Sequence, residues 1–489
     1  MKEINILEVA KAVKGQIING DSSVDISSVS TNSKEVRDGG LFVPIIGENI
    51  DAHNFIEDAY KHGAVACFTS RDNVFNNGIV CIKVEDTLVA LQDLATYYRN
   101  QFSIPVIGIT GSVGKTTSKE IVSSVLSTKY NVLKTAGNMN SQIGLALTMF
   151  RIEDYHDIAV IEMGISEEGE MDRLVRIAQP DIAIVTNIGI SHIALLKTQK
   201  NIRKEKLNII NEFKEGSILF VNGNDPLLRE LVDLSNNCKS KEGLQKLDKI
   251  DLSVTTYKKF KDSHVISFGT NDKNNYSAKN INTIDGKTFF TLVNLENDIE
   301  EDIILNVLGD HNINNALCAI SVAKFYNIPI SLAKKGLEDY KPIAMRGEIK
   351  KTDGIIIIDD TYNASPDSMK SGIDVLLSIN NTNRKIAVLA DVLELGSLSG
   401  KAHTDVGEFI ARKKIDEVIT IGKEARYIAQ GVTTNNKNIV TRSFDNNEQA
   451  AQYLLETIET GDAILVKGSR GMKTEEIVNS IMSKCNKTK

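Results

Sequence analysis

Val106 to Ser118 read VIGITGSVGKTTS and contain the parts of a phosphate-binding loop. Residues 105–110 are apolar enough for a buried strand, and the segment KTTSKEIVSSVL, which begins at Lys115, has the apolar spacing of a helix. Glycines between strand and helix free backbone N–H groups to surround an anion, while a lysine supplies charge and a threonine hydroxyl can reach Mg²⁺. The residues predicted to bind the nucleotide are Gly111, Ser112, Val113, Gly114, Lys115, Thr116 and Thr117.

The spacing of this loop departs from the most common phosphate-loop pattern. That pattern places a glycine six residues before the lysine, where this chain has Ile109. An ordinary glycine turn between a strand and a helix therefore remains the alternative. The motif predicts a nucleoside triphosphate as the ligand and leaves the reaction open.

The composition is that of a globular protein with room for about three domains. The chain has 489 residues, of which 42% are hydrophobic and 25% charged, and its formal net charge is -7. A negative balance argues against a non-specific nucleic-acid surface. Five cysteines without paired metal spacing favour a reducing cytoplasm. The N-terminal stretch MKEINILEVAKAVKG predicts an amphipathic helix rather than a signal peptide, and no apolar run is long enough for a membrane span.

The order of apolar runs and helical stretches predicts an α/β fold in three domains. Residues 1–100 mix short strands and helices, as in a small α/β substrate domain. Residues 101–335 alternate strands with helices, which predicts a P-loop-type domain with a mostly parallel sheet. Residues 336–489 repeat the alternation and predict a Rossmann-like, doubly wound domain.

One region of the central domain differs in character. The lysine-rich segment NNCKSKEGLQKLDK, within residues 235–260, predicts a mobile insertion. The segments HVISFG, KTFFTLVNL and EDIILNVLG, which follow it, predict antiparallel strands.

Polar clusters follow several predicted strands, where open α/β sheets bind their ligands. Glu162 ends an apolar strand and could reach a Mg²⁺ ion held by Thr116, although strand-end carboxylates also cap helices. His192, in TNIGISHI, could bind a second divalent cation or be structural. Asn312 and Asn315 stand three apart in GDHNINNALCA, where amides could contact adenine or cap the helix.

Further candidates lie toward the C-terminus. The segment DDTYNASPDSM places Asp359 and Asp360 at the end of a predicted strand. Arg346, in the preceding linker, could reach a phosphate or be solvated. Lys467 and Arg470, in VKGSRGMK, predict a carboxylate or phosphate pocket after another strand.

Together these clusters resemble the Mur ligase family, the ATP-dependent amide-forming enzymes of peptidoglycan synthesis. The phosphate loop of that family is GxxGK[ST], which residues 111–116 satisfy. The segments KTAGNMNSQIGLALTM, AVIEMG, TNIGISHI, GDHNINNALCAI, IDDTYNASPDSM, LADVLELG and ILVKGSRGM follow the family's order along nearly the whole chain. They are most similar to the members that join D-alanyl-D-alanine to UDP-N-acetylmuramoyl-tripeptide, because the Asp-Asn-Pro-Arg motif of the third-residue-adding members is absent.

The resemblance implies roles for individual residues. Lys115, Glu162, His192 and Lys206 would be catalytic, and two Mg²⁺ ions would be held by Thr116, Glu162, His192 and Lys206. Lys206, in NIRKEKLNII, would be carbamylated, although a solvated basic helix is the alternative. The residues that would contact ATP beyond the loop are Asn312, Asn315, Arg346, Asp360, Tyr362 and Asn363. Those that would contact the substrates are Ser33, Lys34, Asn138, Asn140 and Lys467.

The resemblance also implies partners and leaves some points open. UDP-N-acetylmuramoyl-tripeptide and D-alanyl-D-alanine would be substrates of a monomeric, cytoplasmic enzyme that binds no nucleic acid. Asn32, Lys34 and Ala52 replace the family's usual Asp, Arg and Gly, so the mode of UDP-sugar binding stays open. The alternatives are a third-residue-adding or polyglutamylating ligase and an uncoupled nucleotide switch. The third peptide residue, diaminopimelate or lysine, is also left open.

Overall fold

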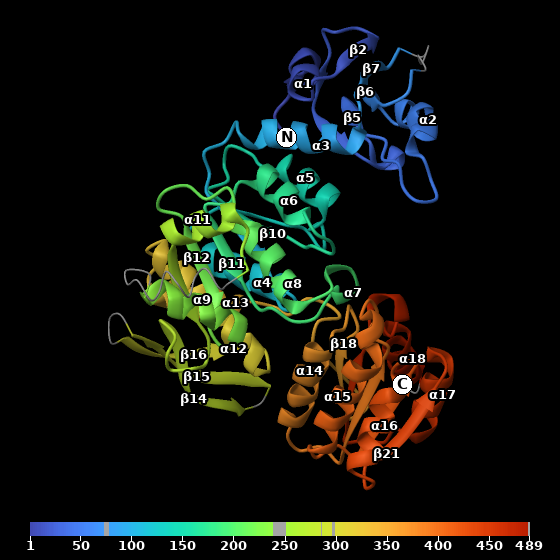
Figure 1. Ribbon diagram of the computed structural model, residues 1–489. Helices are drawn as coiled ribbons and strands as arrows, with labels where there is room; N and C mark the ends of the chain where they lie inside the picture. The colour runs from blue at the N-terminus through green and yellow to red at the C-terminus, as the bar shows by residue number, and fades with distance from the viewer. Residues whose placement is uncertain (73–77, 238–250, 285, 296–298, 488–489) are drawn as a thin grey trace.

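The computed structural model describes residues 1–72, 78–237, 251–284, 286–295 and 299–487. Three α/β bodies follow one another along the chain, and the central one joins the N-terminal body (blue) to the C-terminal body (red) in Figure 1. The predicted α/β fold in three domains is therefore confirmed. The predicted lysine-rich insertion falls almost entirely outside the described residues. Within these residues, no helix has both the length and the apolar character needed to cross a membrane.

The N-terminal body is built on a small mixed sheet. Its strands, in sheet order, are β2 (Gln16–Asn19), β7 (Val80–Lys83), β6 (Ala64–Thr69), β5 (Gly40–Phe42) and β4 (Ser28–Ser30). Its remaining elements are β1 (Ile4–Asn5), β3 (Asp25–Ile26), α1 (Ile6–Ala12), α2 (Ile56–Lys61) and α3 (Thr87–Arg99). The helix predicted from the first residues begins only at Ile6, because residues 4–5 pair with β3 and the Asn5 side chain accepts from the Leu7 N–H.

The central body contains a long sheet that is parallel in its inner part. Its strands, in sheet order, are β16 (Ile299–Leu305), β15 (Lys287–Asn294), β14 (Tyr276–Ile284), β13 (His264–Phe268), β12 (Ile218–Asn222), β11 (Ile182–Val185), β8 (Val106–Thr110), β10 (Ile158–Glu162) and β9 (Val132–Lys134). Its helices are α4 (Lys115–Leu126), α5 (Gln142–Met149), α6 (Glu170–Ala178), α7 (Ile193–Leu196), α8 (Gln199–Leu207), α9 (Pro226–Asn237), α11 (Val254–Asp262), α12 (Asp310–Phe325) and α13 (Ile330–Asp339). The predicted strand at 105–110 and the predicted helix after it are confirmed.

The direction of one strand in this sheet was predicted wrongly. HVISFG forms β13, which pairs parallel with β12, because α9 and α11 return the chain to the starting edge before β13 begins. The antiparallel prediction holds for β15 and β16, which form a ladder with β14. β14 was not predicted, because its segment YSAKNINTI is polar and largely exposed.

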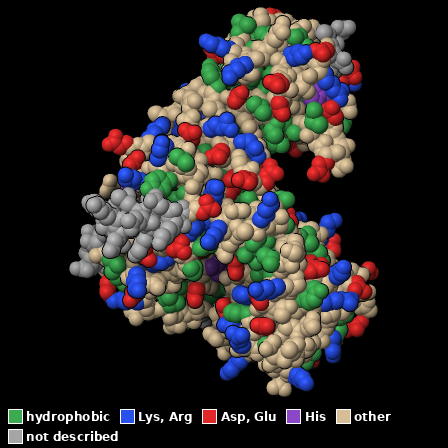
Figure 2. Space-filling model, in the orientation of Figure 1, with side chains coloured by type: hydrophobic (Ala, Val, Ile, Leu, Met, Phe, Trp, Pro, Cys, Tyr) green, Lys and Arg blue, Asp and Glu red, His purple; other side chains and the backbone are tan. Residues whose placement is uncertain are grey.

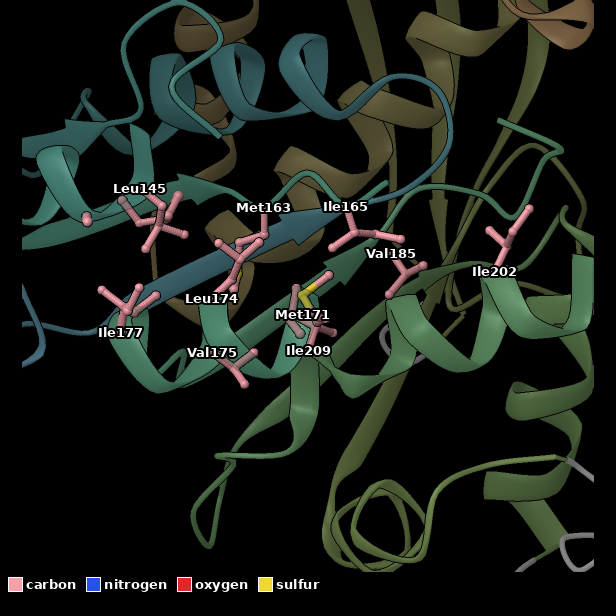
Figure 3. Close-up of a cluster of buried hydrophobic side chains, with 14 of the residues drawn as sticks. Leu145, Met163, Ile165, Met171, Leu174, Val175, Ile177, Val185, Ile202 and Ile209 are labelled. Carbon is pink, nitrogen blue, oxygen red and sulfur yellow. The ribbon is translucent and has the colours of Figure 1, made fainter. Parts of the chain in front are cut away.

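The inner parallel strands β8, β10, β11 and β12 are mostly apolar because helices cover both faces of the sheet. Along β8, Val106 belongs to the cluster beneath α5 and α6, whereas Ile107 and Ile109 belong to the cluster beneath α4 and α12. Figure 3 shows the first cluster, with side chains from α5, α6 and α8 meeting those of the sheet. Gly108 permits this close packing, since a Cβ there would lie 2.9 Å from the Met163 sulfur.

The C-terminal body is a second open sheet with helices around it, as the alternation predicts. Its strands, in sheet order, are β17 (Glu348–Thr352), β18 (Ile355–Asp360), β22 (Asp462–Lys467), β19 (Arg384–Ala390), β20 (Glu417–Ile421) and β21 (Val440–Phe444). Its helices are α14 (Pro366–Ser378), α15 (Ser399–Ala411), α16 (Arg426–Asn435), α17 (Asn447–Thr457) and α18 (Glu475–Lys487). Only β17 runs antiparallel to its neighbour, and its polar sequence EIKKT gave no strand signal.

Candidate active site

A cavity of about 370 Å³ lies between the carboxyl edge of the central sheet and the C-terminal body. It brings together most of the residues that the sequence singled out, from segments more than 300 positions apart. Those lining it are Ser112, Val113, Gly114, Lys115, Thr116, Thr117, Asn138, Asn140, Glu162, His192, Asn312, Arg346, Asp360, Tyr362, Asn363 and Lys467. This cavity is called the cleft below.

The phosphate loop is held in shape by the segment that follows β11. Gly111 has φ +151°, and a Cβ there would lie 1.8 Å from the Thr186 hydroxyl, so the position admits only glycine. The Asn187 side chain accepts from the Val113 N–H at 2.8 Å, and Gly114 begins α4 in the left-handed conformation. A motif with two residues between its glycines, rather than four, can therefore still form a phosphate-binding loop at a helix N-terminus.

Lys115 folds back over this loop. Its Nζ donates to the Gly111 carbonyl at 2.8 Å. Burial lowers the pKa of Lys115 and nearby Arg346 lowers it further, although Glu162 opposes the shift. A phosphate bound at the loop would give the Lys115 ammonium a negatively charged partner.

Glu162, at the end of β10, faces the start of α4. Its Oε1 accepts from the Thr116 hydroxyl at 3.1 Å and from the Asn140 amide at 2.7 Å. Its Oε2 is buried and has no hydrogen-bond partner among the residues that the structure describes. A hydroxyl beside a carboxylate with an unsatisfied oxygen is a donor set that fits Mg²⁺. No group of three His, Cys, Asp or Glu side chains in the described ranges could hold a metal, so other oxygens would have to complete the shell.

His192 lines the cleft, whereas Lys206 is not among the lining residues but is close enough for its charge to act on His192. The His192 Nδ1 is 2.6 Å from a carboxylate oxygen of Glu394, which belongs to the C-terminal body. Burial lowers the pKa of His192, and Lys115 and Lys206 add to the shift against the opposing effect of Glu394.

Lys206 is only 2% exposed, whereas the side chain of Lys204 is 38% exposed. The alternative of a fully solvated basic helix is therefore wrong at Lys206. Burial, together with the charge of Lys115, puts the pKa of Lys206 well below its usual value. In the part of the chain that is described, no carboxylate pairs with its ammonium.

The two asparagines of α12 occupy different layers. Asn312 lines the cleft and donates to the Leu308 carbonyl at 2.8 Å. Asn315 lies behind it, donates to the Asn312 Oδ1 at 3.2 Å and accepts from the Ser118 hydroxyl at 2.8 Å. Asn315 is not among the residues that line the cleft, so its predicted contact with the nucleotide stays a prediction.

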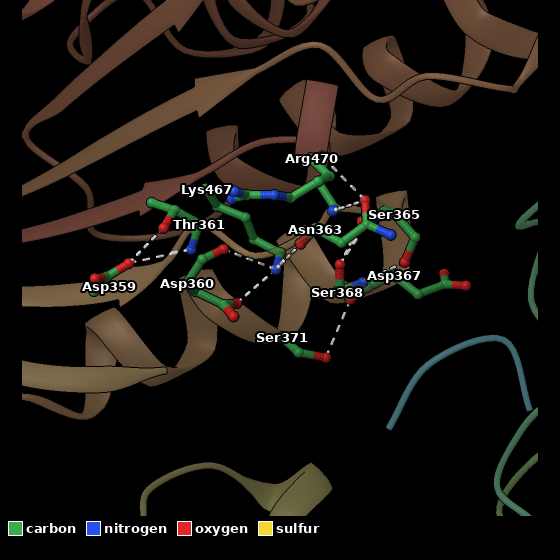
Figure 4. A network of polar contacts seen from close by, with 11 residues as sticks. Asp359, Asp360, Thr361, Asn363, Ser365, Asp367, Ser368, Ser371, Lys467 and Arg470 are labelled. Carbon is green, nitrogen blue, oxygen red and sulfur yellow. Dashed lines mark hydrogen bonds and ion pairs between the residues drawn. The ribbon is translucent and has the colours of Figure 1, made fainter. Parts of the chain in front are cut away.

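The C-terminal wall of the cleft is a polar network, shown in Figure 4. The Lys467 ammonium is 2.6 Å from Asp360 and also donates to the Asn363 carbonyl at 2.9 Å. The Arg346 guanidinium lies 4.0 Å from the centre of the Tyr362 ring. This stacking directs a linker arginine toward the cleft, as the sequence predicted for a phosphate contact.

Ser33 and Lys34 lie in the N-terminal body, outside the cleft. The Ser33 hydroxyl donates to Asp58 at 2.7 Å, and the residue is 8% exposed. Lys34 is exposed, and its N–H donates to the Asn32 side chain at 3.1 Å. Asn32 thus caps the turn, and both Asn32 and Lys34 are exposed to solvent.

Sequence reasoning missed two residues near the cleft, His311 and Glu394. His311 lines the cleft directly before Asn312, and its place in the quoted motif was the only signal. Glu394 stands in the quoted segment LADVLELG, but its contact with His192 depends on how two bodies pack together.

Family models match most of the chain. The Mur ligase family catalytic domain matches residues 25–99, the Mur ligase middle domain matches 109–248 and 244–323, and the Mur ligase, glutamate ligase domain matches 345–470. These three matches fall on the N-terminal, central and C-terminal bodies, respectively.

Individual proteins are similar over their whole length. The UDP-N-acetylmuramoyl-tripeptide–D-alanyl-D-alanine ligase of Bacillus subtilis is 37% identical, with 98% of each chain covered, and that of Escherichia coli is 30% identical, with 98% and 99% covered. Among solved structures, MurF from Acinetobacter baumannii has a TM-score of 0.86 at 26% identity, with 99% of each chain covered. MurF ligase from Thermotoga maritima in complex with ADP has a TM-score of 0.80 at 29% identity, with 94% and 98% covered.

Proposed function

The chain belongs to the Mur ligase family, and we propose from this premise that it joins D-alanyl-D-alanine to UDP-N-acetylmuramoyl-tripeptide in an ATP-dependent reaction of peptidoglycan synthesis. One observation carries the proposal: a single cleft contains a phosphate loop and an unsatisfied carboxylate from the central body, opposite Arg346 and Asp360. Full-length similarity to ligases of this name supports the choice of substrates.

The reaction proceeds through two transfers. The γ-phosphoryl group of ATP passes to the terminal carboxylate of the tripeptide, which leaves ADP and an acyl phosphate. The amine of D-alanyl-D-alanine then attacks the acyl carbon, loses a proton and expels inorganic phosphate. Negative charge increases on the phosphoryl oxygens in the first step and on the acyl oxygen in the second, so cations held in the cleft favour both.

Residues of this chain supply most of the positive charge that stabilises these oxygens. Lys115 and the N-terminus of α4 face the phosphates from one side, and Arg346 faces them from the other. Mg²⁺, which Thr116 and Glu162 would hold with His192 nearby, supplies Lewis-acid stabilisation when bound. Asp360 neutralises Lys467 and fixes it beside Asn363, which keeps the C-terminal wall ordered.

We further propose that Lys206 carries a carbamate. Addition of CO₂ requires a neutral amine, which burial and the charge of Lys115 favour by lowering its pKa. A carbamate would present two oxygens, the ligand type that Mg²⁺ prefers, where a neutral lysine offers only nitrogen. The absence of a carboxylate partner for Lys206 among the described residues supports this modification.

The substrates would reach the cleft from different bodies. We propose that residues 1–100 bind the UDP-sugar, 101–335 bind ATP, and 336–489 bind the amine acceptor. Asn138 and Asn140, in the loop after β9, would then contact the peptide arm of the UDP-sugar substrate. Figure 2 shows a broad hollow between the N-terminal and C-terminal bodies, which gives the substrates a route to the cleft. Use of ATP and a UDP-linked precursor supports a cytoplasmic location, and we propose a monomer.

Release of ADP tests the proposal. ADP should form only when UDP-N-acetylmuramoyl-tripeptide is present, and its steady release should require D-alanyl-D-alanine. Diaminopimelate, lysine and glutamate should not replace the dipeptide. ADP release without any peptide substrate would indicate an uncoupled nucleotide switch, and acceptance of a single amino acid would indicate a different ligase.

A further inference from the structure

A lysine that the mechanism above does not use is completely buried beside the phosphate loop. Lys119 lies one turn after Lys115 on α4 and has no exposed surface. Its ammonium donates to the carbonyls of Thr135 at 2.8 Å and Gly137 at 3.3 Å, and it lies 3.0 Å from a carboxylate oxygen of Glu120. Burying a charged lysine carries a desolvation penalty that only such contacts offset. If the position mattered for packing alone, an apolar residue would fill it without that penalty.

The groups around Lys119 belong to the machinery of the cleft. The Thr135 hydroxyl accepts from the Glu162 N–H at 2.9 Å, so this residue contacts Lys119 with its carbonyl and Glu162 with its side chain. The loop that follows carries Asn138 and Asn140, and the Asn140 amide donates to the Glu162 Oε1. Lys119 therefore joins the phosphate-loop helix to the loop that orients Glu162.

Lys119 also faces Glu162 directly. Its ammonium is 3.9 Å from the Glu162 Oε2, the buried oxygen that has no hydrogen-bond partner. The distance is too long for a hydrogen bond but close enough for electrostatic attraction between two buried side chains. The Glu162 carboxylate thus lies between the Lys119 ammonium and the Thr116 hydroxyl, which lines the cleft.

We propose that Lys119 is a positioning residue for the divalent cation. Its ammonium holds residues 135–140 against α4 and orients the Glu162 carboxylate toward the position that the cation takes beside Thr116. The proposal rests on the proposed function, because it assumes a metal–nucleotide complex at this loop. It assigns Lys119 no contact with substrate.

A role in folding alone makes a different prediction. If Lys119 only stabilised the fold, its replacement would lower thermal stability and leave metal binding in the folded protein unchanged. If it positions Glu162, the affinity for metal falls while the phosphate loop, which Thr186 and Asn187 shape, still binds nucleotide. Metal and nucleotide affinities measured separately distinguish the two roles.

The test uses the full chain and the variant Lys119→Met, which keeps the length of the side chain and removes the charge. ADP affinity is measured by calorimetry in EDTA, and Mn²⁺ affinity of the protein–ADP complex is measured by electron paramagnetic resonance. We expect the Mn²⁺ dissociation constant to rise about 10-fold or more, as for other residues that orient metal ligands. ADP affinity without metal should stay within about 3-fold of the wild type, since the loop and helix N-terminus remain.

Two further variants complete the experiment. Ser123→Ala removes a buried hydroxyl from the same helix, one turn further on, for which the described part of the chain offers no hydrogen-bond partner, and it should leave both affinities unchanged. Lys119→Gln keeps a donor for the Thr135 carbonyl and should also lose Mn²⁺ affinity, which preserves the test if Lys119→Met does not fold.

Wild-type Mn²⁺ affinity in either folded Lys119 variant would overturn the inference, as would an equal loss of metal-free ADP affinity. If the wild-type protein itself bound neither ADP nor Mn²⁺, the proposed function would fail instead.

Discussion

At the scale of single residues, Lys115 gives the most direct test of the phosphate loop. Lys115→Ala should leave the fold intact, because the side chain lies over the phosphate loop and donates to the Gly111 carbonyl. Ligation should fall at least about 100-fold, since removal of a charge that acts in the transition state costs about 3 kcal/mol. The rate of product formation and the thermal melting curve measure the two effects. More than a tenth of the wild-type rate in a folded variant would contradict the role given to Lys115.

Lys206 and Lys204 form a matched pair on α8. Lys206→Ala should be nearly inactive, because it removes the buried amine proposed to carry the carbamate. Lys204→Ala should remain active, because that side chain is partly exposed beside Asp251. A short carboxylate such as acetate, added to the assay, should partly restore Lys206→Ala by supplying oxygens at the vacated position.

Full activity of Lys206→Ala would contradict the carbamate. Failure of every short carboxylate to restore activity, with wild-type melting behaviour, would favour a role for the unmodified amine.

The predictable part of the cleft consists of residues at strand ends. The strands β8, β10 and β11 are parallel neighbours, so their carboxyl ends meet at one edge of the sheet. At these ends the chain places Lys115, Thr116, Glu162 and His192. The contact between Glu394 and His192 could not be predicted, because it depends on packing between two bodies. The inward placement of Asn315 likewise depends on the rotation of α12 against Ser118.

At the scale of an element, Asp51 anchors the short turn before α2. Its carboxylate accepts from the His53 N–H at 2.9 Å and from the His53 ring at 2.6 Å, and it pairs with Arg71. Burial by itself would raise the pKa of Asp51, but these hydrogen bonds outweigh it and lower the pKa from 3.8 to about 2. Asp51 therefore stabilises the fold above about pH 4, and this contribution is lost as the pH falls toward 2.

Asp51→Asn should accordingly lower the free energy of unfolding at pH 7 by about 1–2 kcal/mol, allowing for solvent screening of a partly exposed group. Urea unfolding followed between pH 7 and pH 3 should show the difference from the wild type shrinking below about pH 4. Asp72→Asn is the control, because Asp72 pairs with Lys83 but its side chain is 88% exposed. A difference that stays constant with pH would contradict the account of Asp51.

Errors among the elements also have physical causes. The polar segments of β14 and β17 show no apolar alternation: β14 is buried only in its first three residues, and β17 is a partly exposed strand at a sheet edge. The direction of β13 could not be read from its own residues, since strand pairing depends on the connection that precedes it. The apolar strands buried on both faces, such as β8 and β10, were predictable from short apolar runs alone.

At the scale of the whole molecule, the C-terminal body should select the amine. It contacts the central body through Glu394, which pairs with His192, and through Val375, which lies close to Gly309. A chimera in which residues 336–489 come from another Mur ligase should accept that ligase's amine and still require ATP, because the phosphate loop is unchanged. Competition between the two acceptors, with products separated by mass, measures the change. A folded, active chimera that still prefers D-alanyl-D-alanine would contradict this division of labour.

The amide bond that this chain is proposed to form gives a product of defined mass, which can be measured in a single reaction. The purified protein is incubated with UDP-N-acetylmuramoyl-tripeptide, D-alanyl-D-alanine, ATP and Mg²⁺, and the mixture is examined by mass spectrometry. We expect UDP-N-acetylmuramoyl-pentapeptide together with equal amounts of ADP and phosphate, and at least about 100-fold slower formation of this product when Lys115→Ala replaces the wild-type protein. ATP consumption by the wild-type protein without any pentapeptide would contradict the proposed function.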